Sequence, residues 1–233
     1  MLYFFKVNQF NKNGITIVEV ENQNEGEDFA KDFLYKNSDP ATVLFLSGGK
    51  TPKAIYEQIL LENKLSYGAI GMIDERYGLT GHQKSNALLM DKFSPFYPVL
   101  SGENIEKTSQ DYDETVRYLF NYFQKSIGIL GIGGDGHTAG IPAIPHIAEK
   151  ILEDRFEYVT FFDAKDGFYD KRITLTFNGL SRLDQILVLV FGEEKKYALK
   201  KMFKEGPVTE IPARFYLTPE MVGKTILVTD QNV

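Results

Sequence analysis

Short apolar runs alternate with longer amphipathic segments along the chain, and this alternation constrains the fold more than any other feature. The clearest run, Ile186–Phe191, holds six consecutive apolar residues, which is typical of a strand buried on both faces of a parallel sheet. The expected strands are Ile15–Val20, Thr42–Leu46, Ala69–Ile73, Gly128–Ile132, Tyr158–Phe162, Ile173–Thr176, Gln185–Phe191 and Thr225–Thr229. The expected helices are Glu25–Lys36, Pro52–Glu62, Asn86–Phe93, Asp111–Lys125 and Glu193–Lys204. Strands that alternate with helices predict βαβ units around a mainly parallel sheet.

Length and composition favour one α/β domain over residues 1–233, since 43% of the 233 residues are hydrophobic and can fill a single core. The absence of cysteine excludes disulfides, thiol nucleophiles and Cys-ligated metals. A net charge of −6 argues against nucleic acid as a partner, because binding to phosphate backbones needs a basic surface. The sequence does not indicate an oligomeric state.

The first residues, MLYFFKVNQFNKNG, predict a first strand, because they lack the basic region, the longer apolar stretch and the cleavage site of a signal peptide. No run approaches the roughly 20 apolar residues of a membrane span. We therefore expect a soluble, cytoplasmic protein with no membrane partner.

Polar and glycine-rich segments follow several of the expected strands. In open α/β sheets, ligands bind beyond the carboxyl ends of the strands. The segments at those ends are Ser47–Thr51, Asp74–His82, Gly133–Ala139 and Gly192–Lys195. They predict one pocket formed by residues that are far apart in the sequence.

The first segment, Ser47-Gly48-Gly49-Lys50-Thr51, lies between a strand and a helix, with Thr51 expected as the helix N-cap and Pro52 at the first helical position. Adjacent glycines allow a ligand to approach the backbone closely, and a helix N-terminus binds anions. Lys50 and the hydroxyls of Ser47 and Thr51 complete a candidate phosphate cradle. A nucleotide-binding P-loop is excluded because it needs a glycine where this chain has Leu44. A plain strand–turn–helix connection is the simpler alternative.

The segment Gly131–Thr138 contains the letters of a dinucleotide-binding fingerprint, G-x-G-x-x-G, but no helix opens directly after it, as that fingerprint requires. Its more informative feature is Asp135-Gly136-His137. A carboxylate two residues before an imidazole can orient the ring, and histidine titrates near neutral pH, as a general base must. The alternative is that His137 only satisfies a hydrogen bond of the turn.

Further charges are expected at the same edge. Arg76, after Asp74 and Glu75, is a planar donor suited to a phosphate or carboxylate. The alternative is that these three residues form a solvated charge cluster on a loop. Arg172 opens a later strand. Lys195 lies in a first helical turn, where the helix dipole disfavours a cation unless an anion is near. His146 follows a proline-rich loop and is expected to be structural.

In this order and spacing, the motifs resemble the 6-phosphogluconolactonase family, which is related to glucosamine-6-phosphate deaminase. The matching segments run over most of the chain: Ser47-Gly48-Gly49-x-Thr51-Pro52, Asp74-Glu75-Arg76, Ser85-Asn86, Gly131-x-Gly133-x-Asp135-Gly136-His137-x-Ala139, Arg172-Ile173-Thr174 and Gly192-x-x-Lys195.

The resemblance implies a modified Rossmann-like three-layer α/β/α fold and hydrolysis of a phosphorylated sugar lactone without a required cofactor or metal. It implies phosphate contacts from the Ser47–Thr51 segment, Arg76 and Lys195. It also makes His137 the catalytic candidate. We group Asp74 and Arg172 with the substrate-binding residues and Asp135 with His137.

Two alternatives remain open. A deaminase is expected to carry Asp-Glu-Tyr where this chain has Asp74-Glu75-Arg76, and a glutamate where it has Pro142, which cannot ionise. A non-catalytic sugar-phosphate sensor would be expected to have a basic DNA-binding segment, which this chain does not offer. The chain departs from the lactonase pattern at Gly140-Ile141-Pro142-Ala143 and at Arg214, which replaces a small hydroxyl residue.

Overall fold

The computed structural model describes residues 7–165 and 170–233 and centres on a seven-stranded sheet with the strand order β1-β2-β10-β9-β6-β3-β4. Its neighbours run parallel except for β1 and β2, which form an antiparallel pair at one edge. The strands are β1 (Asn8–Lys12), β2 (Ile15–Glu19), β3 (Thr42–Leu46), β4 (Ala69–Met72), β6 (Lys125–Gly131), β9 (Gln185–Val190) and β10 (Thr225–Thr229). The mainly parallel sheet expected from the sequence is confirmed.

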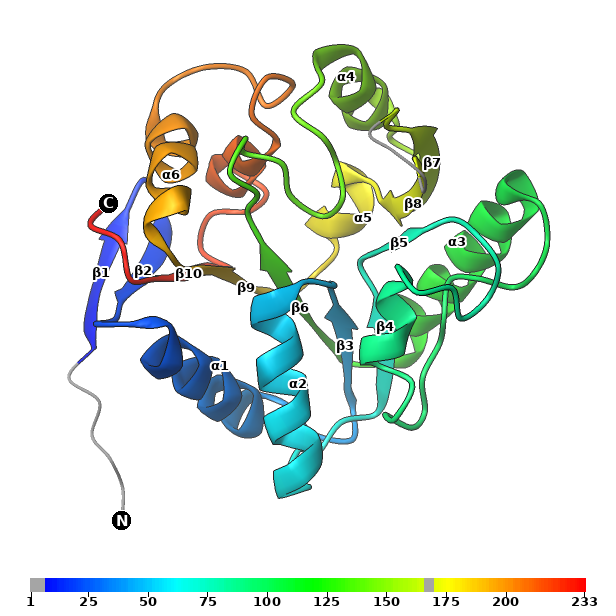
Figure 1. Ribbon diagram of the computed structural model, residues 1–233, viewed down its shortest axis with the longest axis horizontal. Coiled ribbons are helices and arrows are strands. Elements are labelled where there is room, and N and C mark those ends of the chain that lie inside the picture. Colours follow the sequence, from blue (N-terminus) through cyan, green and yellow to red (C-terminus); the bar gives the residue numbers. More distant parts are fainter. Residues whose placement is uncertain (1–6, 166–169) are drawn as a thin grey trace.

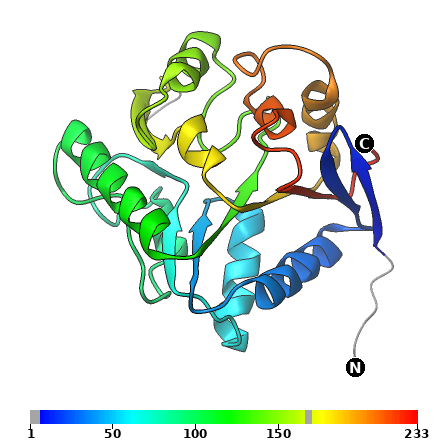
Figure 2. The same cartoon turned by 180° about the vertical axis from the view of Figure 1, so that it is seen from behind.

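Helices cover both faces of this sheet (Figures 1 and 2). On one face lie α1 (Gln23–Asn37) and α2 (Lys50–Glu62), which contact each other. On the other lie α5 (Phe177–Ser181) and α6 (Lys196–Phe203). The remaining helices are α3 (Ile105–Tyr122), α4 (Pro145–Glu153) and the short 3₁₀ helices η1 (Asn86–Leu89), η2 (Glu193–Lys195) and η3 (Pro212–Leu217). The three-layer α/β/α fold is therefore confirmed.

A second, antiparallel sheet of three strands lies beside the first, in the order β5-β8-β7. It contains β5 (Asp74–Arg76), β7 (Val159–Asp163) and β8 (Lys171–Leu175). The segment Asp74–His82 was expected to follow the end of a strand, but its first three residues form a strand of their own, β5. Charged residues do not predict a buried strand, and here the burial of Glu75 is made possible by hydrogen bonds from residues ten to twelve positions away.

The apolar runs form the core. Every residue of β3 is buried, as are five of the six residues of β9. Burial of β-branched and aliphatic side chains on both faces explains why these strands were recognisable as uninterrupted apolar runs. The parallel arrangement brings the carboxyl ends of β3, β6 and β9 to one edge of the sheet, where the polar segments follow.

Several expected boundaries are wrong. The helix expected over Asn86–Phe93 is only the 3₁₀ turn η1, and α3 begins at Ile105, with the side chain of Asn104 capping it by accepting a hydrogen bond from Lys107 N. Helix α4 was not expected. Gly49, not Thr51, is the N-cap of α2. For the expected N-terminal strand, β1 covers Asn8–Lys12, whereas residues 1–6 lie outside the described residues.

Within residues 7–165 and 170–233, no helix combines the length and the hydrophobicity needed to cross a bilayer.

Candidate active site

A cavity of about 760 Å³ lies at the carboxyl edge of the large sheet and is lined by every residue that the sequence analysis assigns to the site. These residues are Ser47, Gly48, Gly49, Lys50, Thr51, Asp74, Arg76, Asp135, His137, Arg172 and Lys195. They come from the ends of β3 and β6, from β5 and β8 of the small sheet, and from η2. The single pocket predicted from the sequence is thus present.

The amino end of α2 opens into this cavity. Its N-cap, Gly49, has φ +123°, a conformation that side chains disfavour, so a glycine is required there. The first turn contains no acidic residue that would neutralise the positive end of the helix dipole. The backbone N–H groups of Lys50 and Thr51 belong to this turn and have no acceptor within the helix. This end of α2 has the free N–H groups and the positive dipole end that suit an anion.

Ser47 precedes this turn and is buried at the cavity wall. Its backbone is fixed from two sides, because its N–H donates to Ile129 O at 3.1 Å and its carbonyl accepts from the Tyr56 hydroxyl at 3.0 Å. The Ser47 hydroxyl oxygen is buried and has no hydrogen-bond partner among the described residues. The serine therefore carries unused hydrogen-bonding capacity at the rim of the glycine turn.

His137 is presented by a tight loop that follows β6. The loop is closed by hydrogen bonds from Gly133 N to His137 O at 2.8 Å and from Gly136 N to Gly133 O at 3.0 Å. Gly136 has φ +97°, and the hydrogen bond from Ala213 N to its carbonyl ties the loop to the first turn of η3. The imidazole lines the cavity with 49% of its side chain exposed, so the ring is not turned into the core.

The Asp135 carboxylate orients this ring. Its Oδ1 atom lies 2.6 Å from Nδ1 of His137 and also accepts the backbone N–H of His137 at 3.1 Å. With Nδ1–H donating to the carboxylate, Nε2 is the ring nitrogen that can accept a proton. Partial burial would raise the pKa of Asp135, but the hydrogen bonds and the charge of His137 lower this pKa below its usual value. This arrangement of carboxylate and imidazole is one that a general base can use.

The small sheet supplies the opposite wall. Arg76 of β5 and Arg172 of β8 are directly opposite in the strand register, and both line the cavity. Two like charges at such a cross-strand position repel each other. Asp74 lies beside them and is 8% exposed; burial raises its pKa, while Arg76, His137 and Arg172 act in the other direction.

Lys195 closes the site from the end of β9. It is half-buried at the last position of η2, and its N–H donates to Gly192 O at 2.9 Å. Lys195 was expected in the first turn of a helix; it lies instead in the short 3₁₀ helix η2 and is the N-cap of α6, which begins at Lys196. Its neighbour Lys196 is exposed and pairs with Glu193 at 3.5 Å.

The cavity also includes residues that the sequence analysis did not assign to the site. Gln23, at the start of α1, follows β2 at the same edge of the sheet. It could have been predicted, because ligands bind beyond the carboxyl ends of parallel strands. Asn86 was noted only in the Ser85-Asn86 motif and as the start of an expected helix, and Glu194 only as part of the segment Gly192–Lys195. Pro142 lies in the wall at the position where a deaminase is expected to carry a glutamate.

No group of three or more His, Asp or Glu side chains suited to a metal ion occurs in residues 7–165 and 170–233. The other two histidines lie outside the cavity. His82 contacts backbone, with Nε2 2.9 Å from Arg76 O and Nδ1 accepting from Lys84 N at 3.2 Å. His146 is exposed at the start of α4.

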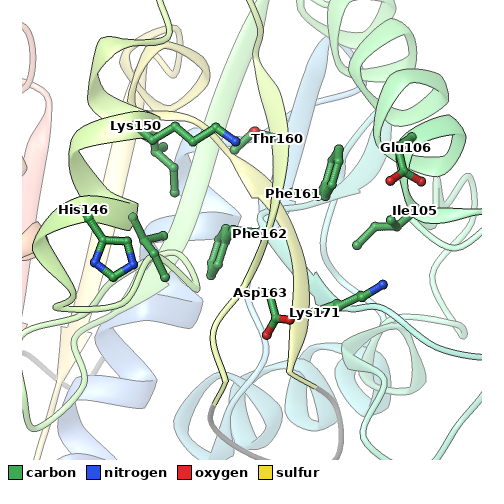
Figure 3. A pocket seen from close by; sticks show the side chains of 11 residues that line it. Ile105, Glu106, His146, Lys150, Thr160, Phe161, Phe162, Asp163 and Lys171 are labelled. Carbon is green, nitrogen blue, oxygen red and sulfur yellow. The ribbon is translucent and has the colours of Figure 1, made fainter.

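His146 lines a separate, smaller hollow of about 320 Å³. Figure 3 shows Phe161 and Phe162 on β7 pointing to opposite sides of the strand, with His146 and Lys150 on α4 and Glu106 on α3. Asp163 and Lys171 belong to this hollow, whereas their sequence neighbours Ala164 and Arg172 line the large cavity. None of the predicted site residues belongs to the smaller hollow.

Comparison with known proteins places these features in a family. The model of the family "Glucosamine-6-phosphate isomerases/6-phosphogluconolactonase" matches residues 27–226. A 6-phosphogluconolactonase from Synechocystis sp. is 31% identical, over 80% of this chain and 81% of its own. A glucosamine-6-phosphate deaminase from Clostridium perfringens is 28% identical, over 83% of this chain and 86% of its own.

Solved structures share the fold. The 6-phosphogluconolactonase from Plasmodium vivax superimposes with a TM-score of 0.78 at 20% identity, covering 97% of this chain and 94% of that chain. At this identity the likeness concerns the fold alone. Because both lactonases and a deaminase are among the relatives, the reaction must be argued from the residues of the cavity.

Proposed function

The chain belongs to the glucosamine-6-phosphate isomerase/6-phosphogluconolactonase family, and we propose that it hydrolyses 6-phospho-D-glucono-1,5-lactone to 6-phosphogluconate, a reaction of the pentose phosphate pathway. The observation that carries this proposal is that the Asp135–His137 pair and the amino end of α2 open into the same cavity. A lactone with a phosphate group needs both a base and an anion site. The enzyme would be a carboxylic ester hydrolase with no cofactor.

The phosphate is held by the turn Ser47–Thr51, with Arg76 and Lys195. The turn contributes N–H groups of the first turn of α2 and the side chains of Lys50 and Thr51. Arg76 and Arg172, which are opposite each other in the strand register, both line the cavity and place guanidinium groups suited to a phosphate beside this turn. Binding the phosphate fixes the lactone ring, so that the attack becomes effectively intramolecular.

His137 acts as the general base. Its Nε2 takes a proton from a water molecule as the water oxygen attacks the lactone carbonyl, and Asp135 stabilises the imidazolium formed at that moment. The bond between the carbonyl carbon and the ring oxygen then breaks, and His137 returns the proton to the ring oxygen. No covalent nucleophile is needed, because the carbonyl is already electrophilic and the leaving oxygen stays tethered to the product.

Residues of the cavity disfavour the deaminase alternative. Moving protons between adjacent carbons of an amino sugar requires further ionisable groups. The position expected to supply a carboxyl is Pro142, and the position expected to be tyrosine is Arg76; both line the cavity. Relatives named as deaminases nevertheless resemble this chain at 28% identity, so the two reactions must be compared directly.

The test offers the purified protein two substrates. Stopped-flow measurement of acid release from 6-phosphoglucono-1,5-lactone, corrected for spontaneous opening, should show turnover. Incubation with glucosamine 6-phosphate should release no ammonia. Ammonia release without lactone hydrolysis would replace the proposal by the deaminase. Binding of a phosphosugar with no turnover of either substrate would favour the non-catalytic sensor.

A further inference from the structure

Glu75 is fully buried, yet it takes no part in the proposed chemistry. Its carboxylate accepts four hydrogen bonds, three of them from the segment Ser85–Ala87: the Ser85 hydroxyl at 2.7 Å, Asn86 N at 2.8 Å and Ala87 N at 3.0 Å. The fourth comes from Arg76 N at 2.7 Å. A buried carboxylate with this many donors fixes the position of the segment that supplies them.

The residue at the centre of that segment is Asn86, whose side chain is buried and reaches into the wall of the large cavity. Its Oδ1 accepts a hydrogen bond from Arg76 Nη1 at 3.0 Å. Its Nδ2 donates to the backbone carbonyl of Asp74 at 3.0 Å and to Asp74 Oδ2 at 3.2 Å. The two ends of one amide thus hold a cation and a carboxyl group of the site in a fixed relation.

The same amide packs against the glycine turn. A Cβ atom built on Gly48 would lie 2.0 Å from Asn86 Oδ1 and 2.8 Å from Nδ2, so that the absence of a side chain at Gly48 is what makes room for Asn86. The backbone of Gly48 does not have a positive φ. Gly48 is therefore explained by the lack of space for a side chain beside Asn86, and not by its backbone conformation.

We infer that Asn86, anchored by Glu75, is a positioning residue that sets Arg76 and Asp74 against the glycine turn before a phosphorylated ligand binds. This inference rests on the proposed function for the identity of the ligand. Asn86 acts through its neighbours: it fixes the distance between the guanidinium group and the amino end of α2, which must both reach one phosphate.

The first test removes the amide. Asn86→Ala should raise the KM for the lactone about tenfold or more and leave kcat within about threefold of the wild-type value, because binding is impaired while His137 is untouched. A matched control is Asn37→Ala, which removes a similar amide at the far end of α1 and its hydrogen bond to Phe33 O; this variant should keep the wild-type KM. If Asn86 had only a structural role, Asn86→Ala would lower thermal stability without raising KM selectively over its effect on kcat.

The second test uses the contact with Gly48. Gly48→Ala alone should raise KM, because the new methyl group displaces the Asn86 amide. In the double variant Gly48→Ala/Asn86→Ala the methyl group meets no amide, so the second substitution should add little to the effect of Asn86→Ala. The effects on KM must then be strongly non-additive. Additive effects in this cycle would overturn the inference.

Calorimetric binding of 6-phosphogluconate separates this inference from the proposed function. If the wild-type protein hydrolyses no lactone, the proposed function fails, but the same cycle can be measured in Kd for that sugar phosphate. Asn86→Ala should then raise Kd about tenfold or more. A folded Asn86→Ala protein with KM and Kd within twofold of wild type would contradict the positioning role.

Discussion

The imidazole of His137 lies directly over the α-carbon of Gly133, so that a Cβ atom on Gly133 would be 2.0 Å from Cε1 and 2.1 Å from Nδ1 of the ring. Gly133 does not have a positive φ, and its hydrogen bond to His137 O closes the loop. The position of the proposed general base therefore depends on the absence of one methyl group.

Gly133→Ala should lower kcat by at least about tenfold, because the ring must move away from the Asp135 carboxylate that orients it. Steady-state lactone hydrolysis measures this loss. The matched comparison is Gly134→Ala, whose new methyl group would meet its nearest atom at 3.8 Å, an ordinary contact. Equal losses of kcat in the two variants would show that the position of the ring does not depend on Gly133.

Asp74→Asn should stabilise the protein at neutral pH. Burial raises the pKa of Asp74 above its ordinary value of 3.8, so the native state holds this proton more tightly than the unfolded chain does. The wild-type protein therefore loses stability as the pH rises from about 4 through the raised pKa, whereas an asparagine does not titrate. The difference in unfolding free energy between the variant and the wild type should grow over that range and then level off.

Urea unfolding at a series of pH values measures this difference. Asp91→Asn, a substitution of an exposed carboxylate, is the control. A difference for Asp74→Asn that shrinks as the pH rises would show that the favourable charges of Arg76, His137 and Arg172 outweigh burial.

Arg76→Ala should chiefly raise KM, by about tenfold or more, because the guanidinium binds the phosphate alike in the ground state and the transition state. Its Nη1 atom is already held by Asn86 Oδ1 and by Lys84 O, each at 3.0 Å, so the group is ordered before the ligand arrives. Arg182→Ala, which removes an exposed arginine outside the cavity, is the control. An unchanged KM in Arg76→Ala would remove Arg76 from the phosphate site.

Arg214→Ala should destabilise the fold by about 2–4 kcal/mol. Arg214 is 8% exposed; its Nε donates to Lys201 O and Lys204 O near the end of α6, and its Nη1 to Pro207 O. Truncation of the side chain removes these three hydrogen bonds from a buried position. Urea unfolding measures the loss, and a change below about 0.5 kcal/mol would show that water replaces these hydrogen bonds.

Much of the large sheet could be predicted from the sequence because its strands are buried on both faces. The runs Thr42–Leu46 and Gln185–Phe191 match β3 and β9 to within one residue at either end. The pocket could also be predicted, because parallel strands bring their carboxyl ends to one edge whatever their separation in the sequence.

The elements that were missed are those in which tertiary contacts override local preference. Strand β5 carries three charges, and three of the four donors that stabilise the buried Glu75 carboxylate come from the distant segment Ser85–Ala87. Helix α4 begins at Pro145, which was interpreted as part of a loop although proline suits a first helical turn. Arg76 and Arg172 lie opposite each other because of the register between β5 and β8 in the small sheet. The spacing of residues in the sequence does not reveal this register.

The central claim is that His137 takes the proton of the attacking water, and the kcat of His137→Ala for lactone hydrolysis tests it most directly. We expect kcat to fall by about 10²–10⁴ after correction for spontaneous opening, with KM nearly unchanged and the fold intact. A purified, folded His137→Ala protein that hydrolyses the lactone at the wild-type rate would contradict the account.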